Sequence, residues 1–192
     1  MLGLTMRRLV ISIIALFLVV PLVITGCKTE DTVIPFDSSR PSITVTSDAF
    51  KDGEAIPVKY SCDGINVSPQ IAWTPGPEGT EFYVLLMDDI DAPDKVFSHW
   101  ILYNIPAKVT DLHDGISTNG ILDTGAIQGR NDMTKLGYYG PCPGDQNTHH
   151  YIFTVYAVDT FFQMPAGWRQ DVVDALEGHI LAQGQLTGTY KR

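Results

Sequence analysis

The chain has 192 residues, and its 22 acidic against 13 basic side chains give a formal net charge of −9 at pH 7. This excess of acid argues against nucleic acid as a partner and against adhesion to anionic lipids through a basic patch. The residues that follow an apolar N-terminal segment are enough to bury one sizeable core, and their pattern shows no sign of a second domain.

The first 26 residues have the features of an export signal. Two arginines precede an apolar run from residue 9 to residue 24, which is the order of charged and apolar regions in a signal peptide. The run ends in a Gly26-Cys27 junction that resembles the lipobox of bacterial lipoproteins. We expect residues 1–26 to be a lipoprotein signal peptide and Cys27 to carry the lipid. An uncleaved membrane anchor and an ordinary signal peptide are the alternatives.

A polar segment joins this N-terminus to the folded part. Residues 27–41 include Pro35 and Pro41 and show no sustained apolar period, so we expect a flexible tether. The folded domain is expected to span residues 42–192. The lipid on Cys27 would hold this domain at a membrane on the extracytoplasmic side, in the cell envelope or periplasm.

Short apolar runs separated by turn residues dominate the domain and predict an all-β core. The runs are rich in β-branched and aromatic residues and lie at residues 43–45, 71–73, 82–87, 100–105 and 151–158. The run at 82–87 is apolar throughout, and the run at 151–158 has apolar side chains on both faces. Both features are typical of central strands that are covered on both sides.

Near the C-terminus the apolar spacing becomes that of a helix. Between residues 168 and 183 apolar side chains recur on one face, and Gly184 can end the helix. Residues 186–190 alternate with a period of two and predict a last strand that returns to the sheet. His179 is expected to be a solvated residue of this helix, and His113 a loop residue.

Polar side chains stand at the predicted ends of the central strands. Asp89 follows one strand, His99 lies near the start of the next, and His149 precedes a third. Strand ends can present side chains to a shared cavity, so we expect these three to line one pocket. His149 and His150 are neighbours in an extended segment and point to opposite faces; we assign His149 to the pocket.

These segments together resemble the signature blocks of one protein family. The chain reads DDIDAP at 88–93, SHW at 98–100, GRND at 129–132, GYYGPCPG at 137–144 and HHY at 149–151. Such blocks are similar to those of the phosphatidylethanolamine-binding proteins, in particular the bacterial and archaeal Raf-kinase-inhibitor-like branch. The resemblance implies a mainly β fold, a Greek-key antiparallel β-sandwich with a large central sheet, a smaller sheet, and one or two peripheral helices.

The resemblance also implies a ligand site. In the family, the positions that match Asp89, His99 and His149 line a small anion-binding pocket; Gly140 matches a pocket-lining glycine and Tyr151 an aromatic wall. Imidazole and backbone N–H groups can donate to phosphate oxygens, and a carboxylate can accept from a P–OH group or a ligand amine. We expect a non-enzymatic protein that binds phosphate or a phosphoethanolamine-like group and needs no cofactor.

Two positions depart from the family pattern. Ile90 stands where proline is usual, so the backbone that aims Asp89 is less constrained. His150 stands where arginine is usual. If that arginine pairs with an acid on the outer face, His150 makes the contact dependent on pH. The alternative for the whole set is structural, with aspartates that form turns and histidines that are satisfied at strand ends.

Other functions are considered beside this one. Two histidines and a carboxylate can bind iron or zinc, but no metal-specific spacing such as H-E-x-x-H is present, and we expect no metal. A hydrolase is disfavoured because Ser98 and His99 point to opposite faces and no G-x-S-x-G motif occurs. Family members regulate kinases or inhibit proteases through the surface around the pocket. A partner-binding protein of this kind, with an unknown partner, is the alternative function.

Two cysteines remain when Cys27 is acylated. Cys62 and Cys142 are an even pair in a chain bound for an oxidising compartment, and each lies in a turn-rich loop. Family members with a cysteine in one of these loops often have a cysteine in the other, so the resemblance implies a disulfide. Two buried free thiols are the alternative.

Overall fold

The computed structural model describes residues 36–192. The expected signal peptide, the lipidation site Cys27 and most of the expected tether lie outside the described residues. Within residues 36–192, no helix combines the length and the apolar character needed to cross a membrane.

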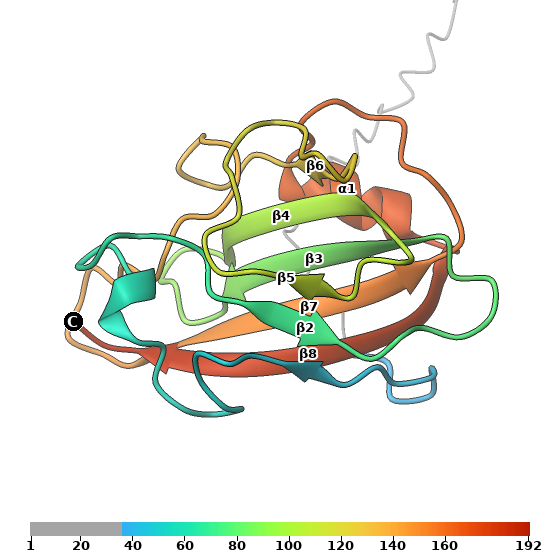
Figure 1. Ribbon diagram of the computed structural model, residues 1–192. Coiled ribbons are helices and arrows are strands. Elements are labelled where there is room, and N and C mark those ends of the chain that lie inside the picture. Colours follow the sequence, from blue (N-terminus) through green and yellow to red (C-terminus); the bar gives the residue numbers. More distant parts are fainter. Residues whose placement is uncertain (1–35) are drawn as a thin grey trace, which may run out of the picture. The chain divides into compact units, whose positions relative to one another are not determined.

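Two antiparallel sheets form the described part of the chain (Figure 1). The larger sheet holds, in spatial order, β6 (Ile127–Gln128), β4 (Phe97–Pro106), β3 (Phe82–Asp89), β7 (His149–Val158) and β8 (Ile180–Tyr190). The smaller sheet holds β1 (Val45–Thr46), β2 (Ile71–Trp73) and β5 (Asp111–Leu112). The helical elements are α1 (Arg169–Leu176) and a 3-10 turn, η1 (Val58–Tyr60). This architecture confirms the predicted fold class.

The larger sheet is buried on both faces. In β3, Tyr83, Leu85 and Met87 pack in the cluster that also contains residues of the smaller sheet. The alternate residues Val84 and Leu86 pack in a second cluster that includes the apolar side of α1. Because successive side chains of a strand point to opposite faces, a strand between two such layers must be apolar throughout. This explains the unbroken apolar run of β3.

Strand register brings the predicted site residues to one end of the larger sheet. Asp89 ends β3 and lies opposite Phe97 of β4 and Tyr151 of β7. His99 is two residues beyond Phe97, and His149 is two residues before Tyr151. Residues two apart share a face, which places His149 on the side of Asp89. His99 lies at a register irregularity between the Met87–Trp100 and Asp88–Ser98 pairs, and it lines the same cavity as Asp89 and His149.

The C-terminal helix is shorter than the apolar spacing predicts. The helix α1 ends at Leu176, Gly178 turns the chain with a φ of 80°, and residues 180–183 already belong to β8. The prediction that the helix runs to residue 183 is therefore wrong. The apolar residues at 180–182 fit a strand as well as a helix, and pairing of β8 along the whole of β7 decides for the strand.

Gly184 is consequently no helix stop. It lies inside β8, where a Cβ atom would come within 1.9 Å of the carbonyl oxygen of Ile43. The close approach of the segment around Ile43 therefore requires a residue without a side chain. His179 lies in the turn before β8 and not in a helix; its exposed ring donates from Nδ1 to Asp159 Oδ1 over 2.8 Å.

A disulfide joins the loop after η1 to the loop that leads into β7. Cys62 and Cys142 are bonded, with their Cα atoms 5.4 Å apart, so the free-thiol alternative does not apply to the structure. The Cys62 N–H also donates to the Pro141 carbonyl over 3.1 Å, and the Tyr138 hydroxyl donates to the Tyr60 carbonyl over 2.6 Å. The loop that follows η1 thus supports the loop that leads into β7.

Candidate ligand-binding site

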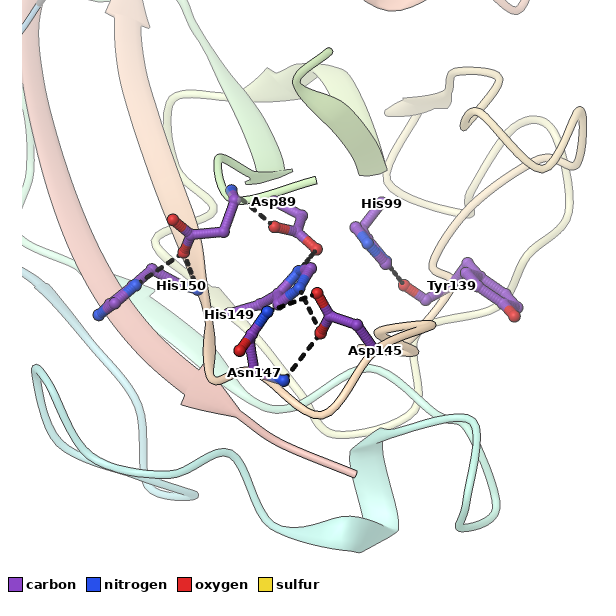
Figure 2. Close-up of polar contacts among 8 residues, drawn as sticks. Asp89, His99, Tyr139, Asp145, Asn147, His149 and His150 are labelled. Atoms are coloured by element: carbon purple, nitrogen blue, oxygen red, sulfur yellow. Dashed lines mark hydrogen bonds and ion pairs between the residues drawn. The ribbon is translucent and has the colours of Figure 1, made fainter. Parts of the chain in front are cut away.

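Asp89 and His149 form a buried ion pair at the end of the sheet (Figure 2). His149 Nδ1 lies 2.7 Å from Asp89 Oδ2, and both side chains are about 5% exposed. The other oxygen of the carboxylate, Oδ1, accepts the backbone N–H of Asp91 over 2.9 Å. This second bond aims Asp89 without the proline that is usual at position 90. Each oxygen of Asp89 thus accepts one hydrogen bond from the protein.

His149 is held between two carboxylates. On its other side, Nε2 lies 3.2 Å from Asp145 Oδ1, a residue of the loop before β7. A carboxylate accepts and does not donate, so the two contacts together require a proton on each ring nitrogen, which is the imidazolium form. Burial alone would lower the pKa of His149, but the hydrogen bonds and charges of Asp89 and Asp145 outweigh burial and raise it.

His99 is held in the opposite way. Its Nδ1 lies 2.7 Å from the carbonyl oxygen of Tyr139, which can only accept, so Nδ1 carries the proton. The ring is 3% exposed, and this burial lowers the pKa of His99. The neutral form, which this shift favours, has a lone pair on Nε2 and can accept a hydrogen bond there. Figure 2 shows His99 turned toward Tyr139 and apart from the group around His149.

A cavity of about 210 Å³ opens between these two histidines and the surrounding loops. Asp89, His99 and His149 line it from the sheet, and Met133 and Pro143 are among the loop residues that line it. Its size suits a small polar group and is below the usual range for drug-sized ligands.

A second cavity, of about 330 Å³, is formed within residues 109–124. Its titratable lining residues, Asp111, His113 and Asp123, are exposed to solvent. The smaller cavity has two buried histidines, one with its pKa raised and one with its pKa lowered. Such groups are more typical of a functional site than exposed side chains, so the smaller cavity is the candidate site.

Gly140 and Tyr151 are not among the residues that line the cavity. The Gly140 N–H donates to Asn66 Oδ1 over 2.7 Å, so it is not available to a ligand as the resemblance implies. A Cβ atom at this position would lie 2.1 Å from the Tyr60 carbonyl oxygen, which explains the glycine.

Tyr151 supports the two histidine rings from within the core. It is fully buried, and its ring centroid lies 5.2 Å from that of His99 and 6.5 Å from that of His149. Burial, with the negative charge of Asp89 nearby, raises the pKa of its phenol. Tyr151 therefore fixes both rings and stays neutral.

His150 faces away from the cavity and pairs with Asp91. Its backbone N–H and its Nδ1 each lie 2.7 Å from Asp91 Oδ2. Burial would raise the pKa of Asp91, but the hydrogen bonds and the charge of His150 together outweigh burial and lower it. Asp91 is thus the acid that position 150 contacts on the outer face. The assignment of His149 and His150 to opposite faces agrees with this geometry.

Two further groups of the site were not predicted. Asp145 contacts His149 from an exposed loop, and the Tyr139 carbonyl sets the tautomer of His99. The sequence offers only a weak signal for Asp145, which stands two residues before Asn147 in a turn-rich segment. Among residues 36–192, no three or more His, Cys, Asp or Glu side chains are grouped so that they could hold a metal ion.

Comparison with protein families identifies the chain. The family model of the phosphatidylethanolamine-binding proteins matches residues 46–191. This range includes the whole candidate site and both sheets, apart from the first residue of β1. The chain belongs to this family. Membership supports a binding protein.

Relatives in the family include proteins of archaea and bacteria. A UPF0098 protein of Methanothermobacter thermautotrophicus is 43% identical over 145 residues, which are 75% of this chain and 95% of that protein. A UPF0098 protein of Aquifex aeolicus is 41% identical over 160 residues, which are 82% of this chain and 93% of that protein.

Two solved structures of phosphatidylethanolamine-binding protein homologues share the fold. The crystal structure of CT736 from Chlamydia trachomatis superposes with a TM-score of 0.71 at 35% identity and covers 79% of this chain and 98% of that chain. The crystal structure of Escherichia coli YbcL, described as a member of the mammalian family, gives a TM-score of 0.73 at 35% identity, with 79% and 99% covered.

Proposed function

We propose that this protein binds a small, singly protonated oxyanion, such as phosphate or a phosphomonoester, in the cavity beside His99 and His149, and releases it unchanged. One observation carries the proposal. Two buried histidines line the same cavity, and their partners fix one ring as a cationic donor and the other as a neutral acceptor.

His149 supplies the donor. Asp89 keeps the proton on Nδ1 and stabilises the cation, so Nε2–H can donate to a ligand oxygen. A charge-assisted hydrogen bond of this kind contributes about 1.5–3 kcal/mol. The net charge of the protein and the absence of an arginine or lysine from the cavity lining keep the total affinity modest.

His99 supplies the acceptor. Each oxygen of Asp89 already accepts one hydrogen bond from the protein and keeps one acceptor site, so a P–OH group can meet an acceptor at Asp89 or at His99. The lone pair on His99 Nε2 can take this role. A phosphate monoanion or a phosphomonoester monoanion offers both an acceptor oxygen and a P–OH donor. Sulfate has the same shape but carries no proton at neutral pH.

Phosphate is therefore expected to bind more tightly than sulfate. A ligand without the proton leaves His99 Nε2 desolvated and unpaired, which costs about 1–3 kcal/mol. The ratio of the two dissociation constants should be on the order of tenfold to a hundredfold. Isothermal titration of the purified protein with phosphate, phosphoethanolamine and sulfate at about pH 6.5 measures this ratio, since histidines titrate near that value when unperturbed.

Variants separate the two roles. His149→Ala should weaken binding of phosphate by about 1.5–3 kcal/mol, whereas His99→Gln should reduce the preference for phosphate over sulfate because its amide group can donate. His179→Ala is the control, since that ring is exposed and bonds to Asp159. Equal affinities for phosphate and sulfate in the wild type would contradict the proposal, and so would unchanged binding in His149→Ala.

A further inference from the structure

The N–H group of His149 that the ligand needs already donates to a residue of the protein. His149 Nε2 carries one hydrogen, and the carboxylate of Asp145 lies 3.2 Å from it. A single N–H makes one strong hydrogen bond, so Asp145 and a ligand oxygen compete for the same position. Figure 2 shows the carboxylate of Asp145 on the side of His149 away from Asp89.

We propose that Asp145 is a built-in competitor that sets the affinity of the site: an oxyanion binds His149 only by displacing the Asp145 carboxylate. The inference rests on the proposed function, because it concerns the same cavity and the same ring nitrogen. In this role, the Asp145 carboxylate raises the dissociation constant of every anion that needs the His149 Nε2–H group.

Asp145 can leave without disturbing the sheet, whereas Asp89 cannot. The Asp145 side chain is 48% exposed and lies in an exposed loop segment, residues 144–148. Its other hydrogen bonds come from the backbone N–H and the side-chain amide of Asn147, both at 2.8 Å. These bonds lie within one short turn and can move with it. Asp89 instead belongs to β3, is buried, and holds His149 over only 2.7 Å.

The net charge of the group around His149 also supports a competitor role for Asp145. With Asp145 in place, one imidazolium stands between two carboxylates, so the group has a net charge of +1 − 2 = −1 and repels an anion. With Asp145 displaced, the pair of His149 and Asp89 has a net charge of zero. The Asp145 carboxylate therefore opposes an anion twice, by occupying the donor and by repulsion.

Removal of the Asp145 charge should strengthen binding of inorganic phosphate. An exposed ion pair and one unit of repulsion across a few ångströms of hydrated protein each change a binding constant by up to about fivefold. We expect the dissociation constant for phosphate to fall on the order of tenfold in Asp145→Asn, which keeps the shape of the turn. Asp145→Ala removes the acceptor altogether and should show a fall of at least the same size.

The control variant is Glu78→Gln, which removes the same charge elsewhere. Glu78 is exposed and precedes the start of β3, at the end of the strand opposite to Asp89. At about 3.3 Å per residue, the strand separates the two ends by more than 20 Å, beyond the Debye length at physiological salt. Phosphate affinity in Glu78→Gln should equal that of the wild type.

Titration calorimetry with inorganic phosphate on the four purified proteins decides the matter. A second readout needs no ligand: histidine NMR should show a lower pKa of His149 in Asp145→Asn, because one of the two carboxylates that raise it is gone. If the wild type binds phosphate and both Asp145 variants bind no more tightly than Glu78→Gln, the competitor role is overturned. If none of the four proteins binds phosphate, the proposed function fails as well.

Discussion

Replacement of Cys62 and Cys142 by serine is expected to lower the free energy of unfolding by about 4 kcal/mol. The disulfide closes a loop with a sequence separation of 80 residues, and in the chain-entropy model a loop of this length restricts the unfolded chain by about that amount. The folded state should persist, because hydrogen bonds from Cys62 to Pro141 and from Tyr138 to Tyr60 hold the same two loops together.

Urea denaturation under non-reducing conditions measures this loss. The matched control is reduction of the wild type, which should unfold at the same urea concentration as the double serine variant, while reductant should leave that variant unchanged. A loss below about 1 kcal/mol would show that the unfolded chain gains little freedom from the missing bond, contrary to the entropic account.

Arg169→Met is expected to lower the free energy of unfolding by about 3–5 kcal/mol, the usual loss when one partner of a buried ion pair is removed. Arg169, the first residue of α1, places Nε 3.0 and 3.1 Å from the two carboxylate oxygens of Asp88. Both side chains are about nine-tenths buried. The variant leaves the Asp88 carboxylate buried without its guanidinium partner, at the end of the strand that also carries Asp89.

The double variant Asp88→Leu and Arg169→Met is the control for loss of packing. Replacement of both charges by apolar groups of similar volume is often neutral, so the double variant should recover most of the stability that Arg169→Met loses. Equal urea midpoints for the single and double variants would mean that the loss comes from contacts of α1 and not from the uncompensated charge.

The sequence predicts the central strands well because a strand buried on both faces has apolar residues at successive positions. The segments of β3, β4 and β7 have apolar side chains on both faces, which is typical of strands covered on both sides. The placement of Asp89, His99 and His149 at one end of the sheet also follows, because each stands at a strand end. For Asp89 and His149 the shared face is then a consequence of antiparallel register.

The chemical roles of these residues depend on contacts that the sequence does not reveal. The tautomer of His99 depends on a carbonyl 40 residues away, and the second partner of His149 lies on an exposed loop. The Gly140 N–H is taken by the side chain of Asn66. Such contacts arise from loop conformation, which local propensity specifies weakly. For the same reason the end of α1 was misplaced, since pairing with β7 overrides a helical apolar period.

The pH dependence of binding follows from the two histidines. Because the pKa of His149 is raised, its cation persists above about pH 6.5, the ordinary value for histidine. As pH rises through the raised value, Nδ1 keeps its proton for Asp89 and Nε2 loses its proton, so phosphate binding should be lost. Because the pKa of His99 is lowered, this ring stays neutral until the pH falls below about 6.5.

Nitrogen-15 NMR of the imidazole rings tests the central claim, that one histidine donates and the other accepts. At about pH 6.5, the free protein should show His149 with both ring nitrogens protonated and His99 as a neutral ring with its proton on Nδ1. Added phosphate should shift the Nε2 resonances of both rings and leave these protonation states unchanged. A neutral His149, or a His99 ring protonated on Nε2, would contradict the account.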